Sequence, residues 1–190
     1  MEVIKAVTAA IGADRVGIRL SPYNYYQDTR DSNPNVHWAY LCEQIANLPK
    51  ENRVSYVHMV EPRFDEDLDE EGKMAALAAY SKLATAGVSE DITKRAGVNS
   101  LVPFRRILAK GGVKFLAAGN FNRDNAQAKI DADDADAIVM GRLFIANPDL
   151  PKRLAEGLPL NPYDRSTFYG ADPPEKGYTD YPFFDAKIGA

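Results

Sequence analysis

The chain has 190 residues, 45% of them hydrophobic and 26% charged, which is the composition of a globular domain with its own core. A net charge of −4 and a pI near 5.3 argue against a nucleic-acid-binding protein. No apolar run approaches the roughly 18 residues of a membrane span. Because no secretory signal is recognisable at the N-terminus, we expect a cytoplasmic protein.

Apolar periodicity predicts an alternation of helices and strands, with residues 158–190 as an irregular, docked tail. The predicted helices cover residues 2–11, 35–48, 73–86, 100–110, 123–135 and 147–157, and the predicted strands cover 15–22, 53–63, 113–122 and 136–141. Asn35 or Ser32 is expected near the start of the second helix, Asn122 and Asn147 are the expected N-caps of two later helices, and Gly157 is expected to end the last helix. We therefore expect four βα units preceded by a helix over residues 1–157, within one partial domain spanning 1–190.

This alternation predicts an α/β fold with parallel strands, either an open doubly wound sheet or part of a (β/α) barrel. The nearly continuous apolar strands suggest that both faces of the sheet are covered. The G-x-G-x-x-G and Walker A patterns are absent. Polar or glycine residues follow each strand: Arg19, Glu61, Gly119–Asn120 and Gly141–Arg142. Barrel enzymes place their ligands at this edge, with phosphate held after the last two strands.

Several stretches in the same order resemble the old yellow enzyme family, which comprises FMN-dependent ene-reductases on a TIM barrel. These stretches are "VGIRLSP", "YVHMVEPR", "FLAAGNFN", "AIVMGRLFIANPDLPKRLAEGLPLN" and "DRSTFYG…GYTDYP". The resemblance runs from Asp14 to about Pro182 and is closest to fungal members. It covers strands five to eight, the C-terminal half of a barrel that needs about 250 residues. The segment from Phe64 to Val98 is longer than the family leads us to expect.

The resemblance implies an FMN site and NADPH as the reductant. It places Arg19 against the flavin ring, where a positive charge stabilises the reduced cofactor. It assigns the FMN phosphate to Gly119, Asn120, Gly141 and Arg142, through backbone N–H groups and the guanidinium group. Phe168 and Tyr169 would lie near the flavin, with Tyr169 and Phe64 near a small unsaturated carbonyl substrate. The family's carbonyl-binding pair and its tyrosine proton donor match nothing in this chain, so no catalytic residue is assigned.

Other interpretations of these residues are structural. Arg19 could pair with Glu61, Gly119–Asn120 could form a plain turn, Arg142 could make a strand-end salt bridge, and Phe168–Tyr169 could anchor the tail. Tyr23, Tyr25 and Tyr26 lie in a loop on the expected substrate side. For His58 a satisfied core position is the expectation, for His37 helix packing, and for Cys42 a buried small hydrophobe. The acidic run at residues 65–69 fails the EF-hand spacing, and no metal site is expected.

Two other functions remain open at this stage. One is a non-catalytic fragment or half-barrel partner without turnover, and the other is an unrelated phosphate-binding barrel half. A half barrel leaves strand edges unpaired and inward side chains, such as Ile18 and Val139, facing an unfilled interior. We therefore expect self-association or a separate chain that supplies the N-terminal half.

Overall fold

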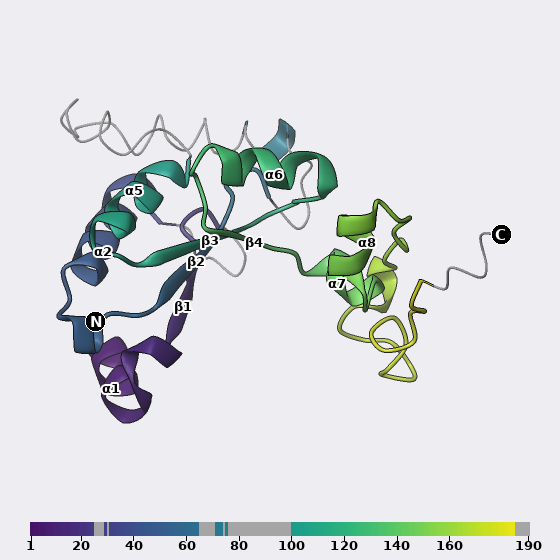
Figure 1. Ribbon diagram of the computed structural model, residues 1–190, viewed down its shortest axis with the longest axis horizontal. Coiled ribbons are helices and arrows are strands. Elements are labelled where there is room, and N and C mark those ends of the chain that lie inside the picture. The colour runs from purple at the N-terminus through teal and green to yellow at the C-terminus, as the bar shows by residue number, and fades with distance from the viewer. Residues whose placement is uncertain (25–28, 30, 65–70, 74, 76–99, 185–190) are drawn as a thin grey trace. The chain divides into compact units, whose positions relative to one another are not determined.

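The computed structural model describes the chain except for residues 25–28, 30, 65–70, 74, 76–99 and 185–190 (Figure 1). Most of the helix predicted at 73–86, the acidic run at 65–69, and Tyr25 and Tyr26 lie outside the described residues. The chain forms two compact units, Met1–Val139 and Met140–Ala190. That the whole chain makes one domain with a tail from residue 158 stays a prediction.

The first unit contains the alternating elements predicted from the sequence. Its helices are α1 (Glu2–Ile11), α2 (Pro34–Ala46), α5 (Val102–Lys110) and α6 (Arg123–Asp131). Its strands are β1 (Gly17–Leu20), β2 (Tyr56–Val60), β3 (Lys114–Ala118) and β4 (Ala137–Val139). Asn122 caps α6 in a reciprocal capping box, as predicted. Helix α2 begins close to Ser32 and Asn35, as predicted, and its N-cap is Asn33, which accepts a hydrogen bond from the Val36 N–H at 3.3 Å.

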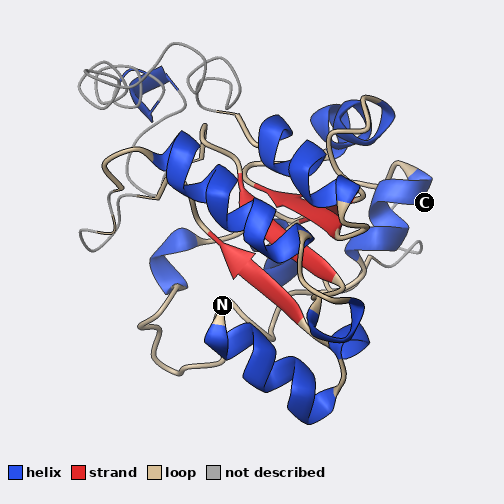
Figure 2. Ribbon diagram, turned by 90° about the vertical axis from the view of Figure 1, so that its left-hand side faces the viewer, coloured by secondary structure: helices blue, strands red, loops and turns tan. Residues whose placement is uncertain are grey.

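The four described strands form one parallel sheet in the order β1-β2-β3-β4 (Figure 2). Each strand therefore lies beside the next one in the chain. A doubly wound sheet reverses its strand order at a switch point, whereas a barrel keeps neighbours consecutive. The consecutive order of the described strands favours the predicted segment of a TIM barrel over a doubly wound sheet.

The two faces of this sheet differ in burial. One face carries side chains that are fully buried, those of Val57, Met59, Phe115 and Ala117. Helices α2 and α5 pack against each other and contribute buried apolar residues to the same core, namely Cys42, Ile45, Phe104 and Leu108. Cys42 is 0% exposed, and burial raises the pKa of its thiol to about 12, which confirms its structural role.

The opposite, open face holds Arg19 and His58, which are paired in register and are exposed and half-buried respectively. The expectation that both faces are covered was therefore wrong for the described residues. The side assigned to Ile18 was also wrong, because the register aligns it with Val57 on the helix-covered face. Val139 aligns with Ala118 and Val60 on the open face, as predicted.

The second unit begins with two short helices, α7 (Arg142–Ala146) and α8 (Leu150–Glu156). The sequence predicted one helix from Asn147, with Asn147 as its N-cap, and missed α7. Asn147 instead ends α7, and its side chain is used elsewhere: Nδ2 donates to the Leu143 and Asn161 carbonyl oxygens. Asp149 takes the N-cap position of α8. Gly157 ends α8 with a φ of 72°, as predicted.

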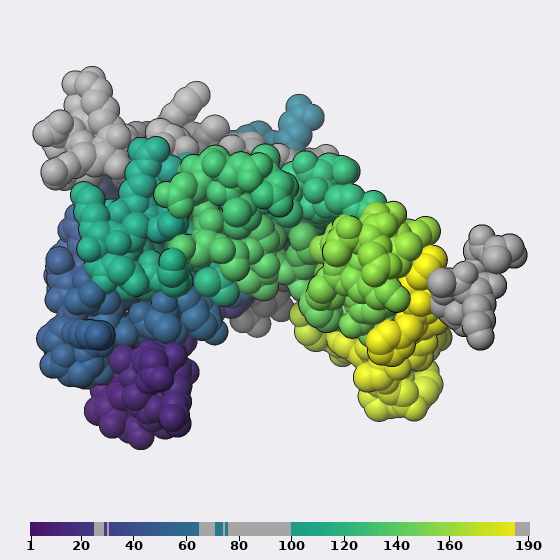
Figure 3. Space-filling model, viewed as in Figure 1, coloured from purple at the N-terminus to yellow at the C-terminus, as the bar shows by residue number. Residues whose placement is uncertain are grey.

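Arg153 of α8 ties the following irregular segment to the helix. Its guanidinium group donates to the carbonyl oxygens of Pro159 at 3.0 Å and Pro182 at 2.9 Å, and it pairs with Asp149 at 2.6 Å. The residue is 2% exposed. Figure 3 shows this segment, in yellow, packed directly against the green helical residues of the same unit. Across the described residues, none of the helices has the length and apolar character needed to cross a membrane.

Candidate functional site

A pocket opens in the first unit where β1 and β2 end. It has a volume of about 60 Å³ and is lined by Arg19, Ser21, Tyr23, Asn24, Val60, Glu61 and Phe64. The structure thus brings together Arg19 and Phe64, two residues selected from the sequence. The cavity is far smaller than the ~300 Å³ or more of an ordinary ligand site, so these residues form one wall of a site and do not enclose one.

The proposed ion pair between Arg19 and Glu61 is not formed. In the described part of the chain Glu61 pairs with Lys129 of α6 at 2.9 Å. Arg19 stays exposed at the open face, next to His58. Burial, and then the charge of Arg19, lowers the pKa of His58 below its usual value, so the imidazole is neutral at pH 7. A positive charge at the pocket wall is therefore available to a ligand.

His58 is not the satisfied core histidine predicted from the sequence. Its Nε2 atom is buried and has no hydrogen-bond partner within the described residues. His37 is exposed and its Nδ1 lies 2.7 Å from Asp31, so it is a surface residue on α2 and does not pack in the core. Tyr23 is 3% exposed, and its hydroxyl donates to Asn35 at 2.7 Å, which gives this pocket residue a structural role.

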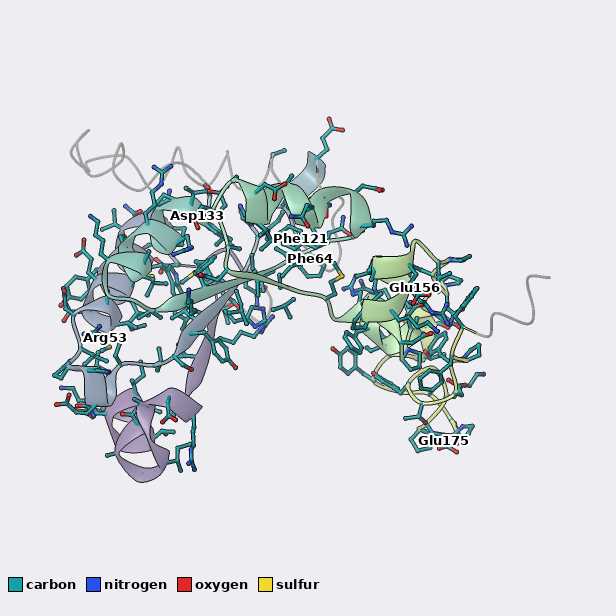
Figure 4. The ribbon with its side chains drawn as sticks, in the orientation of Figure 1. Arg53, Phe64, Phe121, Asp133, Glu156 and Glu175 are labelled. Carbon is teal, nitrogen blue, oxygen red and sulfur yellow. The ribbon has the colours of Figure 1, made fainter. Side chains whose placement is uncertain are left out.

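Gly119 and Asn120 follow β3 with φ values of 119° and 52°, in the region that glycine and asparagine tolerate best. A Cβ atom on Gly119 would lie 2.9 Å from the Glu61 Cβ and 3.2 Å from the Phe64 Cβ. The turn after β2 therefore already requires glycine here, whatever ligand binds. Figure 4 labels Phe64 and Phe121, which belong to the segments that follow β2 and β3.

Gly141 and Arg142 show the opposite pattern in the second unit. Gly141 has an ordinary φ of −93°, and a Cβ atom there would meet nothing within 4 Å. Neither the backbone nor packing within the unit requires glycine at this position. The half-buried Arg142 follows it, with its guanidinium carbon 6.0 Å from the centre of the Tyr163 ring. An open glycine beside an arginine suits the close approach of an anion.

Phe168 and Tyr169 belong to an aromatic cluster in the tail. The Phe168 ring stacks on Tyr163 at 5.9 Å between centroids and contacts Tyr178 at 5.9 Å. Tyr169 is 95% exposed and has a φ of 63°, which is unusual for a residue with a side chain. Its N–H donates to the Tyr178 hydroxyl at 3.1 Å, and its ring meets the Phe168 ring edge-on at 6.4 Å between centroids. Phe168 thus packs within the tail, whereas most of the Tyr169 ring surface is exposed.

The candidate residues thus fall into two groups, one in each unit. Arg19, Phe64, Gly119 and Asn120 belong to the first unit, and Gly141, Arg142, Phe168 and Tyr169 belong to the second. Sequence reasoning missed Tyr163 as the contact of Arg142; the aromatic richness of the tail was the signal for it. Among the described residues no cluster of histidine, cysteine and acidic side chains could hold a metal ion.

Comparison with known proteins supports a single family. The model of the NADH:flavin oxidoreductase / NADH oxidase family matches residues 1–90 and 73–161. The chain is 61% identical over 183 residues to the flavin oxidoreductase hxnT of Emericella nidulans, covering 96% of the chain and 44% of that protein. It is 41% identical over 187 residues to the putative 12-oxophytodienoate reductase 3 of Oryza sativa subsp. japonica, covering 98% and 41%.

The fold comparison agrees with the sequence comparison. The structure of morphinone reductase in complex with tetrahydroNAD matches with a TM-score of 0.68 and 32% identity, over 98% of this chain and 40% of that one. The chain therefore spans less than half the length of these two curated relatives. It corresponds to half of the barrel of those enzymes.

Proposed function

The chain belongs to the NADH:flavin oxidoreductase / NADH oxidase family, the family of the old yellow enzymes, and we propose that it supplies one half of an FMN site. The activity of the complete site would be reduction of the C=C bond in α,β-unsaturated carbonyl compounds, with NADPH as the reductant. The names of the rice relatives as 12-oxophytodienoate reductases support this class of substrate. A cytoplasmic location stays a prediction.

The observation that carries the proposal is the pair Gly141–Arg142. The glycine is required by neither backbone nor packing, and the arginine beside it is held against an aromatic ring. This arrangement is expected of an arginine that binds a phosphate group, because a guanidinium group can donate hydrogen bonds to two phosphate oxygens at once. Gly119–Asn120 would add backbone N–H groups, although packing against Glu61 also explains that glycine.

The chain's own residues would bind and orient the cofactor. Arg142 would hold the phosphate, and Arg19 would present a positive charge at the pocket where Phe64 and Ser21 also lie. Tyr169 would offer its exposed ring to the cofactor or substrate. The chemistry that FMN supplies in such a site is hydride transfer from the nicotinamide to the carbon–carbon double bond.

Removing the guanidinium group of Arg142 tests the phosphate assignment. We expect Arg142→Ala to weaken FMN binding by about 1.5–3 kcal/mol, the contribution of a hydrogen bond to a charged group. The measurement is a titration of FMN fluorescence with the 190-residue chain. Arg165→Ala, which removes an exposed arginine of the same unit, is the matched control and should leave the affinity unchanged. Equal affinity of the Arg142 variant and the parent chain would remove Arg142 from the site.

The second candidate function is a half-barrel partner without turnover, favoured by the absence of a match to the carbonyl-binding pair and the proton donor. We expect little or no reduction of 2-cyclohexenone by the chain with NADPH and FMN. Turnover near 1 s⁻¹ or above, within the ordinary enzyme range, would show that this half is sufficient for catalysis. In a half-barrel partner, the open sheet face would be closed by another copy of the chain or by a separate N-terminal half.

A further inference from the structure

We propose that Tyr163 is the positioning residue for Arg142, and that the aromatic cluster of the tail thereby sets the affinity for the phosphate of FMN. This inference rests on the proposed function. Its starting point is the contact between the Arg142 guanidinium carbon and the Tyr163 ring, 6.0 Å from the ring centre. A cation above the face of an aromatic ring is attracted by the electron density of the ring.

The position of Tyr163 is fixed from both sides along the chain. Two residues earlier, Asn161 donates from Nδ2 to the Ala146 carbonyl oxygen at 2.9 Å, and its N–H donates to the Asn147 side chain at 2.7 Å. One residue later, the Asp164 N–H donates to the Tyr181 hydroxyl at 2.8 Å. The backbone on either side of Tyr163 is therefore tied to its own unit.

These links connect the two ends of α7 to the same short segment. Helix α7 begins at Arg142 and ends at Ala146, so Asn161 holds its last residue while Tyr163 contacts its first. The four helical steps from Arg142 to Ala146 rise only about 6 Å, a distance that two further residues of extended chain can cover. Residues 161–163 thus link the two ends of α7, and this link restricts where the Arg142 guanidinium group can lie.

The ring of Tyr163 is itself supported. Phe168 stacks on it with an interplanar angle of 22°, and Tyr178 packs on Phe168 in turn. Glycine at position 177 allows the segment before Tyr178 to approach Thr167, because a Cβ atom there would overlap the side chain of Thr167. Arg142 therefore contacts a tyrosine that is itself held in a cluster of three rings. A long flexible side chain loses less entropy on binding when it is already held.

The test separates phosphate positioning from general stability by comparing FMN with riboflavin, which lacks only the phosphate. Affinities of the 190-residue chain are measured by fluorescence titration for the parent, Tyr163→Ala and Tyr163→Phe. We expect Tyr163→Ala to weaken FMN binding about threefold to tenfold, the scale of a lost cation–π contact, and to leave riboflavin binding unchanged. Tyr163→Phe keeps the ring and should restore FMN affinity.

A double-mutant cycle with Arg142→Ala completes the test. If Tyr163 acts through Arg142, adding Tyr163→Ala to Arg142→Ala should weaken FMN binding no further. Additive losses, or an equal loss of riboflavin affinity in Tyr163→Ala, would overturn the inference and leave the proposed function standing. If the parent chain shows no preference for FMN over riboflavin, the proposed function fails first, and the inference fails with it.

Discussion

Replacing Arg153 with alanine should release the irregular segment after α8 from its helix. The Arg153 side chain is 3% exposed, and its guanidinium group pairs with Asp149 at 2.6 Å. It also donates to the Asn161 side chain at 3.2 Å and to the Pro159 and Pro182 carbonyl oxygens at 3.0 and 2.9 Å. No other described side chain joins so many points of the second unit.

The size of the effect follows from what the truncation leaves behind. Removing one partner of a buried ion pair costs about 3–5 kcal/mol, because the remaining charge stays buried without its counter-charge. The Asp149 carboxylate would keep only the Phe184 N–H at 2.9 Å among the contacts that link it to the tail. A loss of this size is comparable to the ~5–15 kcal/mol that stabilises a whole domain.

Hydrogen–deuterium exchange measured by mass spectrometry distinguishes local release from global unfolding. In Arg153→Ala we expect faster exchange over residues 159–184, with little change in strands β2 and β3. Lys152→Ala removes an exposed cation from the same helix and is the matched control, which should behave as the parent chain. Unchanged protection of residues 159–184 in Arg153→Ala would refute the argument that this arginine docks the segment.

Two further predictions concern pH and association. Burial acts to raise the pKa of Asp136, but the Phe115 N–H and the Lys114 ammonium group outweigh it and hold the pKa below its usual value. Asp136 therefore stabilises the fold above the unfolded pKa of about 4, and this contribution is lost as the pH falls through the lowered folded pKa. In urea denaturation, Asp136→Asn should reduce the loss of stability on the acid side. An unchanged dependence of stability on pH in this variant would contradict the prediction. Because β1 and β4 are the edges of the described sheet and one face is open, the isolated chain should associate or aggregate in light scattering; a monodisperse monomer with a steep unfolding transition would contradict this.

The sequence alone determined the features that depend on neighbours along the chain. The apolar strands, the capping box at Asn122 and the left-handed end of α8 at Gly157 are all local, and all were predicted. The alternation of strand and helix also predicted parallel strands, which place the residues that follow each strand at one edge of the sheet. The family resemblance placed Arg19 at the flavin ring and Phe64 near the substrate, and the structure has both residues lining one pocket.

Tertiary structure decided everything that depends on partners distant in sequence. Asn147 reads as a helix N-cap, yet its side chain bonds to Asn161, 14 residues on, and the predicted single helix becomes α7 and α8. Ile18 was assigned to the wrong face of the sheet, because strand pairing with β2 sets which side each residue takes. The requirement for glycine at 119 comes from the turn after β2, and the support for Arg142 comes from a tyrosine 21 positions later in the chain. The sequence around each of these residues does not indicate such contacts, because the contacting segments come together only when the chain folds.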